Sequence, residues 1–179
     1  MRRPRRVAHW ALGIGVVVAL LLSGRVLSWL RLVGAPEPLA MPVTGLRARD
    51  VRSTWHAPRS GGRRHQGVDL FAPSGTEVRA AASGTVWKVG HDALGGQVVS
   101  VLGRGPTLYY YAHLDDWAPG LAVGQRVERG ALLGHVGNTG NARTTPPHLH
   151  FGVYRWGWAW ATAVDPAPLL TARRTAPGR

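Results

Sequence analysis

Residues 65–89 read HQGVDLFAPSGTEVRAAASGTVWKV, with short runs of β-prone residues on either side of a turn-forming segment. The two runs are Val68–Phe71 and Thr85–Val89, and Pro73-Ser74-Gly75 lies between them. The same alternation continues along the chain, with further β-prone runs at Gln97–Leu102, Thr107–Ala112, Leu132–Val136, Leu149–Tyr154 and Trp158–Val164. Short strands separated by turns predict an antiparallel all-β domain. We assign this domain to residues 47–172, followed by a disordered tail at 173–179.

The chain has 179 residues, which leaves room for one domain and an additional segment. It contains no cysteine, so a disulfide, a thiolate nucleophile and a cysteine-ligated metal are all excluded. Any metal site must therefore be built from His, Asp and Glu. Such ligands suit Zn²⁺ in a catalytic rather than a structural setting.

Positive charge dominates the composition, with a formal net charge of +13. Residues 1–31 hold six of the 22 basic residues and no acid, and the remainder of the chain has a net charge of +7. The other basic residues are scattered, without the stripe or the stacking aromatics of a nucleic-acid surface. We therefore expect no nucleic-acid partner. A polyanionic cell-wall or membrane environment accounts for the charge.

The N-terminus combines a basic cluster, Met1–Arg6, with an uncharged apolar stretch, Val7–Gly24. As a helix this stretch is about 27 Å long, close to the thickness of the hydrocarbon core of a bilayer. Because arginines favour the cytoplasmic side, we expect residues 1–24 to be a single-pass inner-membrane anchor, with the domain in the periplasm. A cleavable signal peptide is the open alternative, although its cleavage pattern is poor, and a lipoprotein signal would need a cysteine. Three prolines in the following segment predict a juxtamembrane linker at residues 25–46.

Three local patterns of histidine and aspartate point to chemistry. His65 and Asp69 lie four residues apart at the start of a predicted strand, and His148 and His150 lie two apart in another. Even offsets on a strand place side chains on one face, where they can converge on one ion. His113 follows three tyrosines. A surface salt bridge, a cross-strand polar pair or a satisfied core histidine explains each pattern alone. Together they supply two His and one carboxylate for an open catalytic metal site, and two further histidines for proton transfer.

Ordered sequence blocks connect these patterns across residues 55–170. The blocks are His65-x-Gly67-x-Asp69, Ala72-Pro73-x-Gly75-Thr76-x-Val78, Ala81-x-x-Gly84-x-Val86, Tyr111-Ala112-His113-Leu114, Gly124-x-x-Val127-x-x-Gly130, Gly134-x-x-Gly137-x-Thr139-Gly140, His148-Leu149-His150-Phe151 and Asp165-Pro166. In these blocks the chain resembles the lysostaphin-like, or LytM-type, zinc metallopeptidases of metallopeptidase family 23. Many blocks in one order make the resemblance much more specific than any single motif.

The resemblance implies a LytM-type fold in which His65, Asp69 and His150 bind zinc, and His113 and His148 are catalytic histidines outside the metal shell. It also implies hydrolysis of the peptide cross-links of peptidoglycan. Relatives that lack some of these residues are non-catalytic modules that bind peptidoglycan or activate cell-wall amidases, which is the alternative function. The chain keeps all five residues, and this favours the enzyme. The resemblance leaves open which bond is cut, which histidine is the general base, and whether a protein regulator acts on the groove.

Two segments depart from the family pattern. Thr145-Pro146-Pro147 stands before His148, where many relatives have a Gly-Pro pair, and this predicts a reshaped groove wall. Some relatives carry a tyrosine upstream of the first ligand as an oxyanion partner, and His56 or Arg59 is the candidate to replace it here. Two other histidines match no functional position of the family: His91 and His135.

Overall fold

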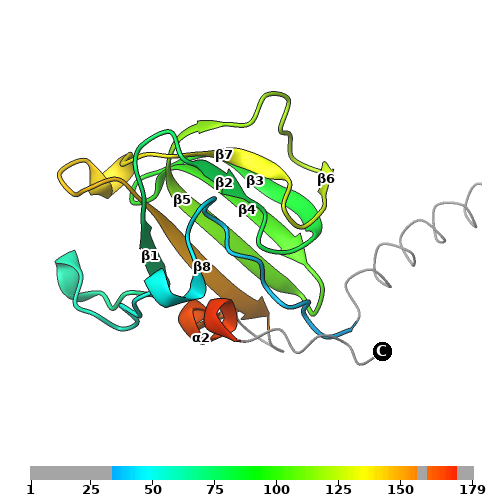
Figure 1. Ribbon diagram of the computed structural model, residues 1–179, viewed down its shortest axis with the longest axis horizontal. Coiled ribbons are helices and arrows are strands. Elements are labelled where there is room, and N and C mark those ends of the chain that lie inside the picture. The colour runs from blue at the N-terminus through cyan, green and yellow to red at the C-terminus, as the bar shows by residue number, and fades with distance from the viewer. Residues whose placement is uncertain (1–33, 157–160, 173–179) are drawn as a thin grey trace, which may run out of the picture. The chain divides into compact units, whose positions relative to one another are not determined.

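An antiparallel β-sheet dominates this computed structural model, which describes residues 34–156 and 161–172 (Figure 1). Its strands are β1 (Val68–Phe71), β2 (Glu77–Arg79), β3 (Gly84–Asp92), β4 (Gly96–Gly103), β5 (Thr107–Trp117), β6 (Arg126–Val127), β7 (Leu132–Val136), β8 (His148–Trp156) and β9 (Ala161–Val164). The described helical elements are three single 3-10 turns and one short α-helix: η1 (Ala48–Asp50), η2 (Ser60–Gly62), η3 (Gly140–Ala142) and α2 (Pro166–Thr171). The predicted antiparallel all-β domain is confirmed.

The long strand β5 connects the parts of the sheet. The main strand order is β1-β8-β5-β4-β3-β6, and β9 pairs with β8. The first half of β5, Thr107–Ala112, pairs with β8, and its second half, from Leu114 onward, pairs with β7. β7 in turn pairs with β2. His113 lies at the point where β5 changes partner, and its φ of 64° falls in the left-handed region that non-glycine residues rarely adopt.

Period-two alternation along β1, β5 and β8 separates the core from the opposite face of the sheet. The alternating core residues are fully buried: Val68, Leu70, Tyr109, Tyr111, Leu149, Phe151 and Val153. The buried hydroxyl of Tyr111 is satisfied, because it accepts a 2.8 Å hydrogen bond from the backbone N–H of Ala81. The residues between these core positions, including Asp69, Tyr110 and His150, line a groove on the other face. One set of strands therefore builds both the core and the groove.

The packed domain begins earlier than residue 47. Val43 is 1% exposed and bridges to Val78, and Leu39 and Met41 pack against the same core. The backbone N–H of Ala40 donates to the carbonyl of Ala81 across 2.8 Å. The C-terminal end of the segment predicted as linker is therefore an edge of the domain. Its prolines suit an extended backbone that packs on a sheet as well as they suit a free linker.

Most of the predicted strands are present, and several are longer than predicted. The seventh predicted run, Trp158–Val164, corresponds to β9, which begins at Ala161, and residues 157–160 lie outside the described part. The predicted membrane anchor at residues 1–24 and the tail at 173–179 also lie outside it. Within residues 34–156 and 161–172, no helix is long and apolar enough to cross a membrane.

Candidate metal centre

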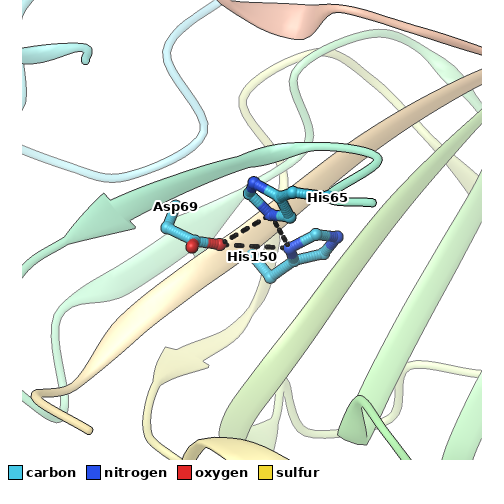
Figure 2. Close-up of side chains that lie close together, drawn as sticks. All are labelled: His65, Asp69 and His150. Atoms are coloured by element: carbon cyan, nitrogen blue, oxygen red, sulfur yellow. Dashed lines mark hydrogen bonds and ion pairs between the residues drawn. The ribbon is translucent and has the colours of Figure 1, made fainter. Parts of the chain in front are cut away.

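Two side chains of one segment, His65 and Asp69, meet His150 from a distant strand (Figure 2), and all three line the groove. Nε2 of His65 lies 2.9 Å from Nδ1 of His150 and 3.1 Å from Oδ1 of Asp69. The separation between Nδ1 of His150 and Oδ1 of Asp69 is also 3.1 Å. Among the described residues, this is the group of His, Asp and Glu side chains that could hold a metal ion. The structure therefore brings together the three residues for which the resemblance implied zinc ligation.

Strand pairing places Asp69 next to His150. The two residues are directly opposite each other in the antiparallel pair of β1 and β8. In such pairs the Cβ atoms of opposite residues are about 4.5–5.5 Å apart, within easy reach of one ion for an imidazole and a carboxylate. Because the four-residue offset of His65 from Asp69 spans an irregular segment before β1, strand periodicity alone does not place His65.

Gly67 allows this irregular segment to approach β8 closely. A Cβ atom at Gly67 would lie 2.6 Å from Cε1 of His150 and 2.7 Å from the carbonyl oxygen of Phe151. Neither contact is sterically possible, and the second involves backbone that cannot rotate away. The His65-x-Gly67-x-Asp69 block therefore needs a glycine at position 67 because a side chain there would collide with His150 and Phe151. The backbone conformation of Gly67 does not itself require a glycine.

The three donor atoms fit a tetrahedral divalent cation. Ligand atoms at about 2.0–2.1 Å from a tetrahedral Zn²⁺ lie about 3.3 Å from one another, close to the separations of 2.9–3.1 Å found here. Two imidazoles and one carboxylate form the donor set of catalytic zinc sites, which keep a fourth position for water. The chemistry and the spacing of these residues thus agree with a zinc site.

Contacts behind the donor atoms fix their orientation. Nδ1 of His65 donates to the carbonyl oxygen of Thr54 at 2.9 Å, and the Thr54 hydroxyl lies at the same distance. In the neutral form of His65 that carries its proton on Nδ1, the nitrogen that faces the site is an unprotonated Nε2. Asp69 uses Oδ1 toward the two histidines, while its Oδ2 forms a short ion pair with the guanidinium of Arg59. Arg59 therefore holds the carboxylate so that a single oxygen faces the metal position.

The electrostatic environment shifts the pKa of two of these ligands, Asp69 and His150, in the direction that favours metal binding. Burial acts to raise the pKa of Asp69, but the adjacent imidazoles of His150 and His65 outweigh it and hold this pKa far below its usual range. Burial lowers the pKa of His150 against the opposing effect of the Asp69 charge. A carboxylate that stays ionised and an imidazole that stays neutral are both ready to bind a cation.

His113 and His148 lie beside the three donors with a common hydrogen-bonding pattern. Nδ1 of His113 donates to the carbonyl oxygen of Thr139 at 2.9 Å, and Nδ1 of His148 donates to that of Pro146 at 2.8 Å. In its neutral form each ring therefore has an unprotonated Nε2, which can accept a proton. Nε2 of His148 is 3.9 Å from Oδ1 of Asp69, and the two rings are 5.0 Å apart between centroids.

Burial lowers the pKa of His113 to about 4, and the neighbouring His148 adds to the shift. His113 is thus neutral at neutral pH and can act as a proton acceptor. Its backbone is fixed on both sides, since its N–H donates to the carbonyl of Gly95 and its carbonyl accepts from the N–H of Gly137. These bonds hold the left-handed backbone that directs the ring into the groove.

The groove that contains these residues has a volume of about 1150 Å³. Tyr110 forms part of its wall, donating its hydroxyl proton to Asp92 at 2.7 Å and packing edge-on against His150 at 6.1 Å between ring centroids. Phe71 lies on another wall, 54% exposed, with its ring 5.1 Å from that of His148. The wall of the groove thus combines polar and apolar side chains.

The remaining sequence candidates divide into those at the groove and those away from it. Thr145 and Pro146 line the groove, and Pro146 orients His148 through its carbonyl, so the unusual Thr145-Pro146-Pro147 segment is part of the site. Arg59 also lines it, whereas His56 is exposed and stacks on Trp55. The histidines that were given no function lie elsewhere in the described part: His91 beside Trp117, and His135 paired with Asp116.

Several residues at the site were not anticipated from the sequence. Thr54 and Asp92 lie in segments without a motif, and Tyr110 belongs to the run of tyrosines before His113 but was given no role. Phe71 is the last residue of β1, and its exposure is visible only in the folded chain.

The sheet, the groove and the His-Asp-His group define the chain as a β-sheet protein with a candidate catalytic metal centre. The sequence model of peptidase family M23 matches residues 63–166, more than half of the chain, and the protein belongs to this family. The L-Ala--D-Glu endopeptidase of Bacillus subtilis strain 168 is 39% identical over 128 residues, which are 68% of this chain and 39% of that protein. The chain thus spans less than half the length of that curated relative.

Solved structures show the same fold. The catalytic domain of the antimicrobial peptidase lysostaphin from Staphylococcus simulans has a TM-score of 0.60 and 30% identity, with 70% of this chain and 96% of that chain covered. A zinc-containing peptidase from Vibrio cholerae has a TM-score of 0.56 and 29% identity, with 66% of this chain and 37% of that chain covered. The resemblance to lysostaphin-like peptidases is therefore confirmed.

Proposed function

We propose that the protein is a zinc-dependent endopeptidase that hydrolyses peptide cross-links of peptidoglycan. The observation that carries this proposal is the meeting of three metal-donor atoms with two histidines whose Nδ1 atoms donate to backbone carbonyls. The relatives support the reaction type, because those named above are an L-Ala--D-Glu endopeptidase, the antimicrobial peptidase lysostaphin and a zinc-containing peptidase. The intact set of five residues favours catalysis over the role of a non-catalytic binding module.

His65, Asp69 and His150 would hold the zinc ion, which when bound lowers the pKa of a water molecule toward neutrality and polarises the scissile carbonyl. The other steps belong to the chain. His113 or His148 accepts the proton of the water at Nε2 and later delivers a proton to the departing amine, so that the peptide C–N bond can break. The protonated imidazole also offsets the negative charge that develops on the carbonyl oxygen. Thr139 and Pro146 hold the two rings in the required tautomer.

Metal analysis and digestion of purified sacculi test this function on the full chain. The wild type should contain one zinc per chain and release soluble peptides, and a chelator should stop the release until zinc is restored. His65→Ala, Asp69→Ala and His150→Ala should each lose stoichiometric zinc and hydrolysis. His91→Ala, which alters an exposed histidine away from the groove, is the matched control and should retain both. A ligand variant with full zinc and full hydrolysis would remove that residue from the metal site.

We further propose that the domain acts in the periplasm, tethered to the inner membrane by residues 1–24. The basic cluster Met1–Arg6 ahead of the uncharged Val7–Gly24 supports this location. The location suits the proposed substrate, since peptidoglycan lies outside the inner membrane. The excess of basic residues in the remainder of the chain also suits a polyanionic cell wall.

A further inference from the structure

Three arginines that precede His65 in the sequence line one wall of the groove. They are Arg59, Arg63 and Arg64, on either side of η2, and the last of them directly precedes His65. The proposed reaction gives a role only to Arg59, through its contact with Asp69. The other two are exposed side chains without a part in holding the metal position.

Local hydrogen bonds hold Arg63 and Arg64 in place without neutralising them. Nε of Arg63 donates to the carbonyl of Ser60 at 3.1 Å, and Nη2 donates to the Ser60 hydroxyl at 3.2 Å. Nη1 of Arg64 donates to the carbonyl of His56 at 3.2 Å. A guanidinium has five N–H donors, so further donors remain on each side chain. In the described part of the chain, neither arginine forms an ion pair with an acid.

The acids of the groove are already engaged. Oδ1 of Asp69 faces the histidines, and its Oδ2 binds Arg59. Asp92 accepts hydrogen bonds from the Tyr110 hydroxyl and the Gly95 N–H, and it lies 3.5 Å from Nζ of Lys88. These two are the acidic residues among those that line the groove. The wall beside the metal position thus carries positive charge that no acid of the groove balances.

We infer that Arg63 and Arg64 bind a free carboxylate of the substrate next to the scissile bond, so that the protein selects peptide strands in which this carboxyl is not amidated. The inference rests on the proposed function and specifies its substrate. Guanidinium groups suit this task, because their planar N–H pairs match the two oxygens of a carboxylate. Arg64 directly precedes His65 and both residues line the groove, so the recognised carboxylate would lie near the bond that is cut.

Chemical amidation of sacculi provides the test. Sacculi free of phosphate polymers are used with their carboxyls intact or converted to carboxamides with carbodiimide and ammonia, so that carboxylate is the anion that varies. The full chain should release peptides from intact sacculi about 10–100-fold faster than from amidated ones, the effect of one or two charge-assisted hydrogen bonds. The Arg63→Gln/Arg64→Gln double variant should lose this preference and keep its zinc. A muramidase that digests both preparations equally shows that amidation leaves the polymer accessible.

A second double variant, Arg104→Gln/Arg126→Gln, separates specific recognition from overall charge. It removes the same net charge from exposed positions that do not line the groove, and it should keep the preference for intact sacculi. Equal release from both preparations by the wild type would overturn the inference and leave the proposed function standing. The same preference in both double variants would also overturn it. Absence of chelator-sensitive release from either preparation would instead remove the proposed function, and the inference with it.

Discussion

At the scale of single residues, His113 and His148 are proposed to transfer protons without binding the metal. Each ring is oriented by a hydrogen bond from its Nδ1 to a backbone carbonyl. His113→Ala and His148→Ala should each keep near-stoichiometric zinc, because neither ring supplies one of the three donor atoms. Hydrolysis should fall by about 10²–10⁴-fold, the usual contribution of a general acid or base. Zinc content and turnover on sacculi, measured on the same preparations, check this. Loss of zinc from His113→Ala would move that residue into the metal shell, and unchanged turnover in both variants would remove the proton-transfer role.

Gly67 offers a second test at this scale, because it binds nothing itself. Gly67→Ala would place a methyl group against the His150 ring and the Phe151 carbonyl, so β1 and the preceding segment would have to move away from β8. We expect zinc affinity to fall by at least about 10-fold, as it does when the support of a ligand is disturbed. Competition with a zinc-binding dye measures this. Gly61→Ala is the contrasting variant, since nothing lies within 4 Å of a Cβ there, and it should leave zinc affinity intact although its φ of 70° strains an alanine.

Through the family resemblance, the sequence indicated all five residues that the structure brings together at the groove, although strand periodicity alone does not place His65. It did not predict Thr54 as a partner, and it offered Arg59 only as an oxyanion candidate. Both belong to an irregular segment, where contacts depend on the path of the chain and not on a periodicity. The proximity of Arg63 and Arg64 to the groove was missed for the same reason.

At the scale of elements, β8 carries the core on one face and the site on the other. Phe151→Ala should lower the free energy of unfolding by about 3–5 kcal/mol, the usual loss when a buried aromatic side chain is truncated. Phe71→Ala in the paired strand β1 should change it by less than about 1 kcal/mol, because Phe71 is 54% exposed. Urea denaturation of the two variants compares them directly. Equal destabilisation would show that Phe71 belongs to the core.

Strands that are four or more residues long were largely visible in the sequence. β2 and β6 were missed, because three and two residues are too few to show alternation. The helix α2 was also missed, although Asp165 caps it through a 2.9 Å bond from the Ala167 N–H and proline opens its first turn. The packed segment at residues 39–46 looked like a linker because its burial depends on contacts with β2, which is distant in sequence.

At the scale of the whole molecule, the proposed location predicts where a C-terminal reporter works. A phosphatase that folds only after export should be active when fused to the end of the full chain, and a reporter that matures only in the cytoplasm should be silent. Deletion of residues 1–24 should reverse this pattern, because it removes the basic cluster and the apolar stretch together. An active cytoplasmic reporter on the intact chain would contradict the proposed location and access to peptidoglycan.

Strands β1, β5 and β8 have core residues on one face and groove residues on the other. This alternation restricts where codons can be gained or lost in the gene for this protein. Deletion or insertion of a single codon within β8 would exchange the faces of the downstream residues, exposing Leu149 and Phe151 while burying imidazoles. Point substitutions on the groove face leave the core residues of the same strands untouched. Lineages can therefore diversify the walls around the metal position by single-base changes, while codon gains and losses are confined to the connections between strands.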